Sequence, residues 1–368
     1  PCFTFSANSP KQRQLNVCLA MTMMRFSLAL FFLLFGCSDA FVSHTQSSQR
    51  RLGPLQATLE GLKAGIVGGG PSGLLLAHYL LQAGASSVDI LERRSRSTDL
   101  ENRAYALGVG MRGRTGIRGI DEKLWQAVKA RGYGSERFTL YIGGGFSVRL
   151  RDGSGGDDGM EPSVLMYQSD LCDALLDELE ERYSKDDSFS IQFDQQVSEC
   201  NLESKTISTE SSKVHGPFDL IVGCDGVNSP VRSAMETSFP GAIQVEKKSL
   251  PGNFKVCRLQ NAPPKVDPTS VALLLPKAGS VTAFVEPTAD GSCILFAGRS
   301  ETDDDPVLNP SSNLTATVEA LETRFPLLEG CDFQDMAKQL STQKGGAASS
   351  VKCNVYHCEG TALVGDAA

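Results

Sequence analysis

A glycine-rich segment near residue 70 has the residue types and the spacing that bind a dinucleotide. Gly68, Gly70 and Gly73 form a GxGxxG pattern, and Glu92 lies 19 residues after the last of these glycines. In such a pattern the first glycine permits a tight turn, the second lets the backbone approach a pyrophosphate, and the third allows close helix packing. An acidic residue at this distance accepts hydrogen bonds from an adenosine ribose, which disfavours a 2′-phosphate there.

The segments around these glycines must position them, and their order predicts a strand, a turn and a helix. Residues 62–67 are a short apolar run, residues 74–83 have helical length and composition, and residues 88–91 form a second apolar run. This order predicts a Rossmann-like unit whose helix N-terminus faces the phosphates. A glycine-rich turn without a ligand is the alternative, and the pattern alone does not distinguish FAD from NAD. The residues assigned to this nucleotide site are Gly68, Gly70, Ser72, Gly73, Glu92 and Arg93.

Three later segments resemble the fingerprints of the single-component, FAD-dependent aromatic hydroxylases, the group A flavoprotein monooxygenases. Phe218–Arg232 is similar to the family's DG fingerprint, and Gly360–Ala368 is similar to its GD motif, whose aspartate binds the ribityl chain of the flavin. Asn102–Leu107 is similar to the segment where the family places an arginine near the flavin. The resemblance extends over residues 62–368. The residues that it assigns to FAD binding are Arg103, Gln168, Asp225, Gly226, Gly365 and Asp366.

Some of these residues also have plainer interpretations. Asp225 and Gly226 are a pair that any turn can contain, because an aspartate side chain bonds its own backbone there. Arg103 is equally a residue type of the protein surface. Cys224, which precedes the pair, has the character of a small core residue and not of a nucleophile.

Within the family, two segments are most similar to the kynurenine 3-monooxygenases. They are Asp219–Gly226 and Ser350–His357, although Gln168 stands where those enzymes have arginine. The resemblance implies substrate contacts in the region of residues 130–150, where Arg137 and Tyr141 are the candidates. For Arg137 a solvated ion pair with the preceding glutamate is as good an interpretation as a carboxylate clamp. No catalytic acid or base is assigned.

The resemblance implies an enzyme that holds FAD, is reduced by NAD(P)H and inserts one oxygen atom of O₂ into an aromatic small molecule, with a kynurenine-like compound as first candidate. In such an enzyme the cofactor carries out the reaction, and the protein orients the reactants and excludes water. One alternative is an FAD enzyme acting on an isoprenoid, either a carotenoid epoxidase or a prenyl reductase. Another is a non-catalytic binding module that retains the flavin fold.

The predicted fold class is α/β, with a Rossmann-like FAD-binding domain and an antiparallel-sheet substrate domain as in aromatic hydroxylases. Four strand-like runs between residues 253 and 298 predict the antiparallel sheet, and residues 313–325 predict a helix after it. Ser169–Ser184 is expected to be a helix capped by Ser169. The strands expected to complete the dinucleotide-binding layer are 189–193, 205–208 and 218–222. The predicted domains are 60–130, 165–235 and 350–368 for FAD, and 131–164 and 236–349 for the substrate.

Composition excludes several classes of protein. The 368 residues carry 35 Lys and Arg against 43 Asp and Glu, a net charge of −8. The sequence has no run of basic residues of the kind that binds nucleic acid, so a nucleic-acid-binding surface is not expected. The 11 cysteines include no CxxC pair, so neither a disulfide scaffold nor a zinc site is expected. The four histidines are too widely spaced to suggest a metal site.

Residues 1–59 have the character of a targeting presequence. We expect translation to start at Met21, because Phe26–Phe35 is then the apolar core of a signal peptide. Phe41–Leu59 contains no acidic residue, which is typical of transit peptides. The pair resembles the bipartite presequence of algae with secondary plastids, which predicts a plastid location, with the secretory pathway as the alternative. We also expect the natural chain to continue beyond Ala368, with a peripheral membrane contact through that further segment.

Overall fold

The computed structural model describes residues 59–96, 105–143, 145–152, 161–183, 185, 187–298 and 304–368. These residues belong to one compact unit, Pro54–Ala368. The predicted presequence lies outside the described residues except for Leu59. None of the helices in the described part of the chain combines the length and apolar character needed to span a bilayer.

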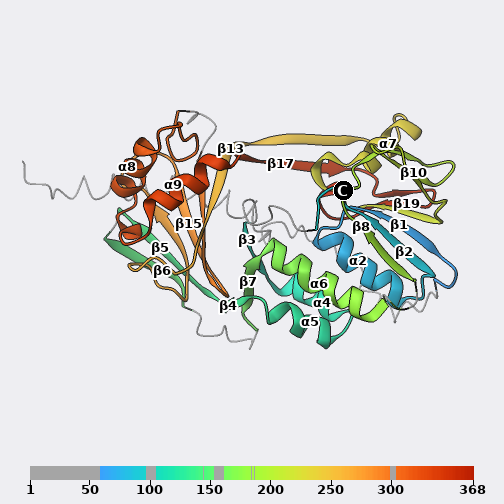
Figure 1. Ribbon diagram of the computed structural model, residues 1–368, viewed down its shortest axis with the longest axis horizontal. Coiled ribbons are helices and arrows are strands. Elements are labelled where there is room, and N and C mark those ends of the chain that lie inside the picture. The colour runs from blue at the N-terminus through green and yellow to red at the C-terminus, as the bar shows by residue number, and fades with distance from the viewer. Residues whose placement is uncertain are drawn as a thin grey trace, which may run out of the picture. The chain divides into compact units, whose positions relative to one another are not determined.

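A six-stranded, mostly parallel sheet carries the glycine-rich segment (Figure 1). Its central strand has four consecutive buried residues, as expected for a parallel strand covered on both faces. The apolar runs predicted at 62–67, 88–91, 189–193 and 218–222 all form strands of this sheet. In spatial order the strands are β18 (His357–Cys358), β19 (Thr361–Leu363), β12 (Leu220–Gly223), β1 (Lys63–Val67), β2 (Ser87–Leu91) and β8 (Phe189–Gln192).

Four helices and a small antiparallel sheet pack beside this layer. The helices are α2 (Pro71–Gln82), α4 (Met111–Arg118), α5 (Glu122–Lys129) and α6 (Gln168–Tyr183). The small sheet has the order β3 (Ala106–Val109), β7 (Ser163–Tyr167) and β4 (Tyr133–Ser135). Trp125 is fully buried in the core that these elements share with the parallel sheet. The helix predicted at 169–184 starts at Gln168, so the prediction that Ser169 caps it is wrong: Ser169 is a buried residue of its first turn.

The strand predicted at 205–208 is present, but its assignment to the dinucleotide-binding layer is wrong. It forms the middle of a separate three-stranded antiparallel sheet, because its neighbours along the chain are close enough to pair with it directly. The strands of this sheet are β9 (Val197–Asn201), β10 (Thr206–Thr209) and β11 (Val214–His215). Helix α7 (Pro230–Ser238) packs against β9 and follows the 3-10 turn η1 (Gly226–Asn228).

A seven-stranded sheet includes the four strands predicted between residues 253 and 298. Its order is β17 (Gly346–Cys353), β13 (Val245–Leu259), β16 (Gly291–Gly298), β15 (Thr282–Thr288), β14 (Val271–Leu275), β5 (Arg137–Ile142) and β6 (Phe146–Asp152). All the pairs are antiparallel except β14 with β5. The predicted helix at 313–325 is α8 (Thr315–Arg324), which packs with α9 (Phe333–Thr342) and the 3-10 turn η3 (Pro326–Leu328). The exact boundaries of the two predicted domains stay a prediction.

One face of the seven-stranded sheet is covered by α8 and α9. Val285 and Ile294 belong to the apolar core that these two helices close. Alternate residues of a strand point to opposite faces, so Glu286 and Cys293 lie on the other face. In Figure 1 this other face is the one turned toward β3 and β7, and β15 packs directly on β7.

The C-terminal residues of β13 pair with β16 on one side and have no partner strand on the other. Two glutamines, one in α9 and one just after it, form hydrogen bonds with the backbone on that open side. The Gln339 amide accepts from Arg258 N at 2.8 Å and donates to Arg258 O at 3.0 Å. Gln343 makes the same pair of bonds with Val256, at 3.1 and 2.7 Å. The side-chain amides therefore take the place of the next strand and satisfy the buried backbone groups.

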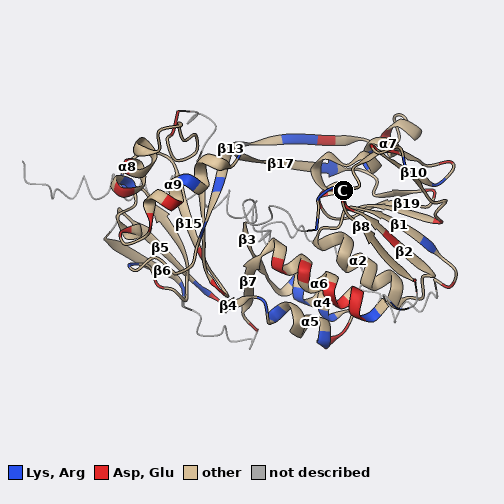
Figure 2. Ribbon diagram, viewed as in Figure 1, with Lys and Arg blue, Asp and Glu red and all other residues tan. Residues whose placement is uncertain are grey.

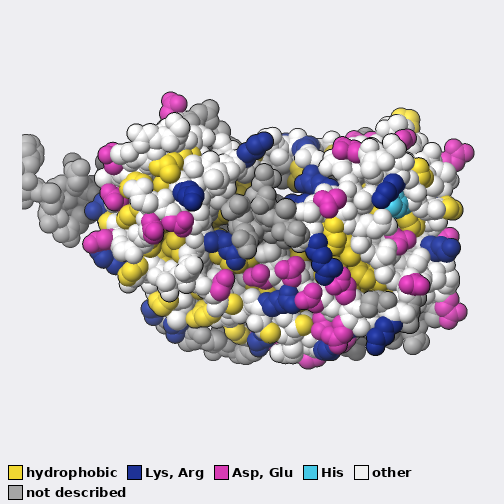
Figure 3. Space-filling model, in the orientation of Figure 1, with side chains coloured by type: hydrophobic (Ala, Val, Ile, Leu, Met, Phe, Trp, Pro, Cys, Tyr) yellow, Lys and Arg dark blue, Asp and Glu magenta, His cyan; other side chains and the backbone are white. Residues whose placement is uncertain are grey.

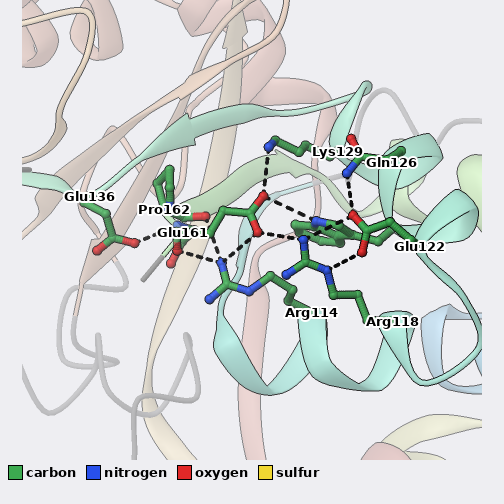
Figure 4. A network of polar contacts seen from close by, with 10 residues as sticks. Arg114, Arg118, Glu122, Gln126, Lys129, Glu136, Glu161 and Pro162 are labelled. Carbon is green, nitrogen blue, oxygen red and sulfur yellow. Dashed lines mark hydrogen bonds and ion pairs between the residues drawn. The ribbon is translucent and has the colours of Figure 1, made fainter. Parts of the chain in front are cut away.

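Charged residues of both signs are interspersed along the ribbon, with acidic residues frequent on α6 (Figure 2). On the face drawn in Figure 3, cationic and anionic groups alternate at short intervals and basic residues form no continuous stripe. A network of polar contacts joins α4 and α5 to the start of β7 (Figure 4). Glu161 is at its centre, 2.9 Å from Arg118, 2.8 Å from Lys129 and 4.0 Å from Arg114.

Candidate functional site

The glycine-rich loop is built by close contacts between the ends of β1 and β12 and the start of α2. Gly68 has φ +105°, and a Cβ there would overlap the carbonyl oxygen of Cys224. A Cβ on Gly73 would overlap the carbonyl oxygen of Gly68. Gly70 caps α2, and a Cβ there would meet nothing within 4 Å. Two glycines are thus required by packing, and the third leaves open space at the N-terminus of the helix.

Glu92 lies at the end of β2, against this loop. Its Oε2 accepts from Gly69 N at 2.7 Å, and its Oε1 accepts from Arg94 N at 2.8 Å. These two backbone bonds fix the carboxylate beside the open N-terminus of α2, where the sequence predicts an adenosine ribose. Arg93 is exposed to solvent.

The DG segment follows β12 and forms η1 and the start of α7. Gly226 has φ +78°, and Ser229 Oγ caps α7 by accepting from Arg232 N at 3.0 Å. Asp225 Oδ2 accepts from Val231 N at 3.4 Å, while its Oδ1 is buried without a hydrogen-bond partner among the described residues. Burial raises the pKa of Asp225, and the Ser229 hydroxyl offsets part of this rise. A buried carboxylate oxygen without a partner is suited to a ligand hydroxyl.

The GD segment forms the short turn η4 (Gly365–Ala367) after β19. Gly365 has φ +67°, and its Cα is so close to Ser72 that a Cβ would come within 2.5 Å of the Ser72 hydroxyl. The structure therefore brings the GD turn against the start of α2. Asp366 is exposed. The pKa of Tyr105 is raised mainly by the burial of its own side chain and, to a smaller extent, by the negative charge of Asp366.

Arg232 joins the DG and GD segments, a role that the sequence analysis did not assign. Its guanidinium donates to Ala367 O at 3.0 Å and to Val227 O at 2.6 Å, and the residue is only 5% exposed. The spacing of Ser229 and Arg232 was the available signal, because it places the arginine in the first turn of a capped helix, beside the cap.

Of two further predicted cofactor residues, one lies beside the small sheet. Gln168 is the first residue of α6, and its backbone N donates to Tyr105 O at 3.3 Å. Arg103 lies outside the described residues. Tyr105, which the sequence analysis did not single out, therefore contacts Gln168 and lies near Asp366.

The substrate contacts suggested at Arg137 and Tyr141 do not lie with these groups. Tyr141 packs against the core beneath α8 and α9, and its hydroxyl accepts from Asp267 N at 3.3 Å. Arg137 donates to Thr269 Oγ1 at 2.6 Å, and no described bond joins it to Glu136. Alternation along β5 puts both side chains on the helix-covered face of the sheet.

The opposite face of the seven-stranded sheet meets the small sheet through aromatic residues. The rings of Tyr105 and Phe254 meet edge to face, with centroids 6.5 Å apart. The Tyr167 hydroxyl donates to Ser292 O at 3.3 Å. This face therefore stands against the residues that adjoin Asp366, and it provides an apolar wall with few polar groups.

A cavity of about 730 Å³ opens at the end of β13, lined by Tyr167, Arg258, Asp290 and Gln339 among others. Its lining includes none of the glycine-loop, DG or GD residues. The nucleotide site is thus identified from loop geometry and not from this cavity. Within the described residues, no group of three or more His, Cys, Asp and Glu side chains is arranged to hold a metal ion.

The arrangement fits FAD. The open N-terminus of α2 can receive a pyrophosphate, and Glu92 is held beside it. The unpartnered Asp225 oxygen and the GD turn come together through Arg232 and Ser72, at the carboxyl ends of the parallel strands where such sheets bind ligands.

Comparison with known proteins agrees with this geometry. The chain's fold is similar to that of a mutant of 2-methyl-3-hydroxypyridine-5-carboxylic acid oxygenase, at 20% identity and TM-score 0.63, covering 84% of this chain and 76% of that one. The fold is also similar to that of a mutant of PqsL from P. aeruginosa, at 19% identity and TM-score 0.60, covering 84% of this chain and 79% of that one. For CtdE in complex with FAD the identity is 14% and the TM-score 0.55, covering 84% of this chain and 78% of that one. At these identities the likeness shows the fold. A search of curated proteins found no match.

A family model described as FAD binding domain matches residues 62–368, which is nearly all of the described chain. The match includes the glycine loop, the DG segment and the GD turn. The chain therefore belongs to the FAD binding domain family of the group A flavoprotein monooxygenases, and it is an FAD-dependent oxidoreductase of that kind.

Proposed function

We propose that this protein hydroxylates an aromatic small molecule, with a kynurenine-like compound as first candidate and NAD(P)H and O₂ as co-substrates. The observation that carries the proposal is the buried, unpartnered oxygen of Asp225 beside the GD turn. A buried carboxylate oxygen costs stability unless a ligand or a protein group completes its hydrogen bonds, so this oxygen favours a ligand hydroxyl at the end of β12.

When bound, FAD supplies the chemistry: it takes electrons from NAD(P)H and activates O₂ for transfer to the ring. The chain's own residues bind and orient. Glu92 is positioned to accept from the ribose, Gly70 leaves room for the pyrophosphate, and Asp225 and Asp366 are positioned to hold the ribityl end. The apolar wall around Phe254 keeps water from the reacting ring, which favours transfer of oxygen over its wasteful release.

The kynurenine-like substrate is supported by the similarity of residues 219–226 and 350–357 to the kynurenine 3-monooxygenases. An aromatic substrate of some kind is also supported by the name of one structural neighbour, which describes a hydroxypyridine carboxylic acid oxygenase. Arg137 and Tyr141 do not contribute to this proposal, since Tyr141 packs beneath the helices and Arg137 is exposed on the same side of the sheet.

The test is to load the full chain with FAD and follow the oxidation of NADPH and of NADH with and without L-kynurenine. The proposal expects oxidation that is stimulated by the substrate, with 3-hydroxykynurenine formed. Asp225→Asn should bind FAD more weakly by at least about tenfold, because the neutral amide presents one acceptor oxygen in place of two charged ones. Bound FAD without stimulation by any aromatic acid or amine would sink the proposal and favour the isoprenoid alternative.

We also propose a plastid location, supported by the signal-like segment at 26–35 and the acid-free segment at 41–59. The test is a fluorescent fusion of residues 21–59 in an alga with a secondary plastid. Retention of the fusion in the endoplasmic reticulum would refute the plastid location.

A further inference from the structure

Glu286 is a buried carboxyl group that the cofactor site does not use. It lies in the middle of β15 and is 3% exposed. No hydrogen bond or ion pair reaches its side chain from the described residues. Burial alone raises its pKa to about 8, since no nearby cation opposes the effect. A carboxyl of this kind is rare in a strand whose other residues are all buried, so it calls for a partner from outside the chain.

The direction of the Glu286 side chain follows from the strand. Its neighbour Val285 packs into the core beneath α8 and α9, so Glu286 points to the opposite face. Glu286 is paired in register with Cys293 of β16, and Cys293 is paired with Arg258 of β13. The three residues therefore form a row across the face of the sheet that has no helix over it.

Glu286 and Cys293 are buried where this row meets the small sheet, and Arg258, which is partly exposed, extends the row to the cavity at the end of β13. The backbone of Ala106 is close enough to Cys293 to lower the pKa of its thiol against the larger effect of burial, and the Arg258 guanidinium lies 3.8 Å from the centre of the Tyr167 ring. Ala106 follows Tyr105, whose pKa Asp366 helps to raise. A series of neighbouring residues, Cys293, Ala106 and Tyr105, therefore leads from Glu286 toward the GD turn.

Of the ionisable groups in and around the row, Glu286 is the one without a charged partner among the described residues. Arg258 lies over Tyr167 and is 3.7 Å from Asp290, so its charge already has partners. Burial raises the pKa of Cys293 to about 12 and also raises that of Tyr167, so both remain neutral at physiological pH. Asp170, which interacts with Arg258, is acidic and supplies no cation.

We propose that Glu286 determines substrate specificity by accepting a hydrogen bond from an ammonium or amino group of the aromatic substrate. The inference rests on the proposed function and narrows it to aromatic amines. It is consistent with a kynurenine-like compound, which offers an α-ammonium and a ring amine. Acids that carry no nitrogen donor would leave the carboxyl buried without a partner and would bind poorly.

The experiment compares three ligands on the FAD-loaded full chain by titration of the flavin absorbance. They are L-kynurenine, its analogue with hydrogen in place of the α-ammonium, and its analogue with hydrogen in place of the ring amine. The variants are Glu286→Gln and, as a matched control, Glu246→Gln, which neutralises an exposed carboxylate on β13 of the same sheet. Thermal unfolding shows that each variant is folded.

The inference expects the wild-type protein to bind one of the two analogues at least about tenfold more weakly than kynurenine. In Glu286→Gln that preference should shrink to less than about threefold, while Glu246→Gln retains it. The affinity of the wild type for kynurenine should also rise with pH up to about 8, as Glu286 ionises, and this rise should disappear in Glu286→Gln.

Equal binding of all three ligands by the wild type would overturn the inference about Glu286 and leave the proposed function standing. The same holds if Glu286→Gln keeps the wild-type preference. If FAD is bound but none of the three ligands binds, the kynurenine-like substrate is wrong, and the assignment of Glu286 falls with it.

Discussion

Single residues show where sequence reasoning was sufficient and where it was not. The roles of Gly68 and Gly73 followed from spacing, because the tight turn and the close helix packing expected at these positions leave no room for a Cβ. Glu286 could not be found this way. A strand with no alternation of polar and apolar residues does not indicate which face its one carboxyl occupies, and the covering helices come from distant sequence.

Two of the loop glycines should respond differently to alanine. Gly68→Ala places a Cβ against the Cys224 carbonyl at φ +105°, so we expect a loss of about 1–3 kcal/mol of stability even without flavin. Gly70→Ala has open space at φ −76°, so the flavin-free protein should melt as the wild type does. Its Cβ would occupy the approach of the pyrophosphate, so its affinity for FAD should fall by at least about tenfold.

Thermal melts of the apoprotein and flavin titrations separate the two effects. Wild-type FAD affinity in a well-folded Gly70→Ala variant would mean that the phosphates lie elsewhere.

Whole elements were predicted better than their boundaries and partners. The strand expected from residue 253 is the second half of β13, which begins at Val245 and passes through Pro251 and Gly252. A register shift between Ser249 and Asn253 accommodates this pair, so the proline and glycine mark an irregularity and not an end. Pairing with β17 continues the strand across it, and β17 is nearly a hundred residues away.

The packing of α4 and α5 on β7 should depend on pH through Glu161. Hydrogen bonding from Lys129, together with Trp125 and Arg118, lowers the pKa of Glu161 to about 2 from a usual value of 4.5. A lowered pKa in the folded state contributes stability above about pH 4.5, and that contribution disappears as the pH falls toward 2. Glu161→Gln should therefore lower the melting temperature at pH 7 and flatten its decline between pH 4.5 and 2.

Scanning calorimetry over this pH range measures the effect. Glu246→Gln, which removes an exposed carboxylate paired with Lys248, is the control and should change little. Parallel pH curves for Glu161→Gln and the wild type would show that Glu161 does not stabilise the packing of α4 and α5.

At the scale of the whole molecule, distant segments are held together by few, buried polar contacts. The GD turn closes the parallel sheet 135 residues after Arg232, and the guanidinium bonds Ala367 directly. Strands β13 and β17 pair with each other from Val245 and Cys353 to Phe254 and Gly346, and both belong to the seven-stranded sheet. A resemblance to a family predicted which segments meet; it did not predict that a buried arginine joins them, since such a contact depends on atomic packing.

Arg232→Met should lower the free energy of unfolding by about 2–4 kcal/mol, because the carbonyls of Val227 and Ala367 lose their charged donor in a buried site. It should also weaken FAD binding, since the DG and GD turns lose their common anchor. Denaturant unfolding with and without FAD measures both. Arg151→Met, at an exposed ion pair with Glu136, should leave both quantities nearly unchanged. Unfolding of Arg232→Met at the wild-type denaturant concentration would contradict this account.

The two glutamines at the edge of β13 affect how the protein aggregates when it is heated. If α9 detaches, Gln339 and Gln343 leave with it, and the backbone of Val256 and Arg258 becomes an open template for a strand of another molecule. Aggregation on heating would then begin at this edge while FAD is still bound. The temperature at which samples turn cloudy would be set by one helix and not by the cofactor.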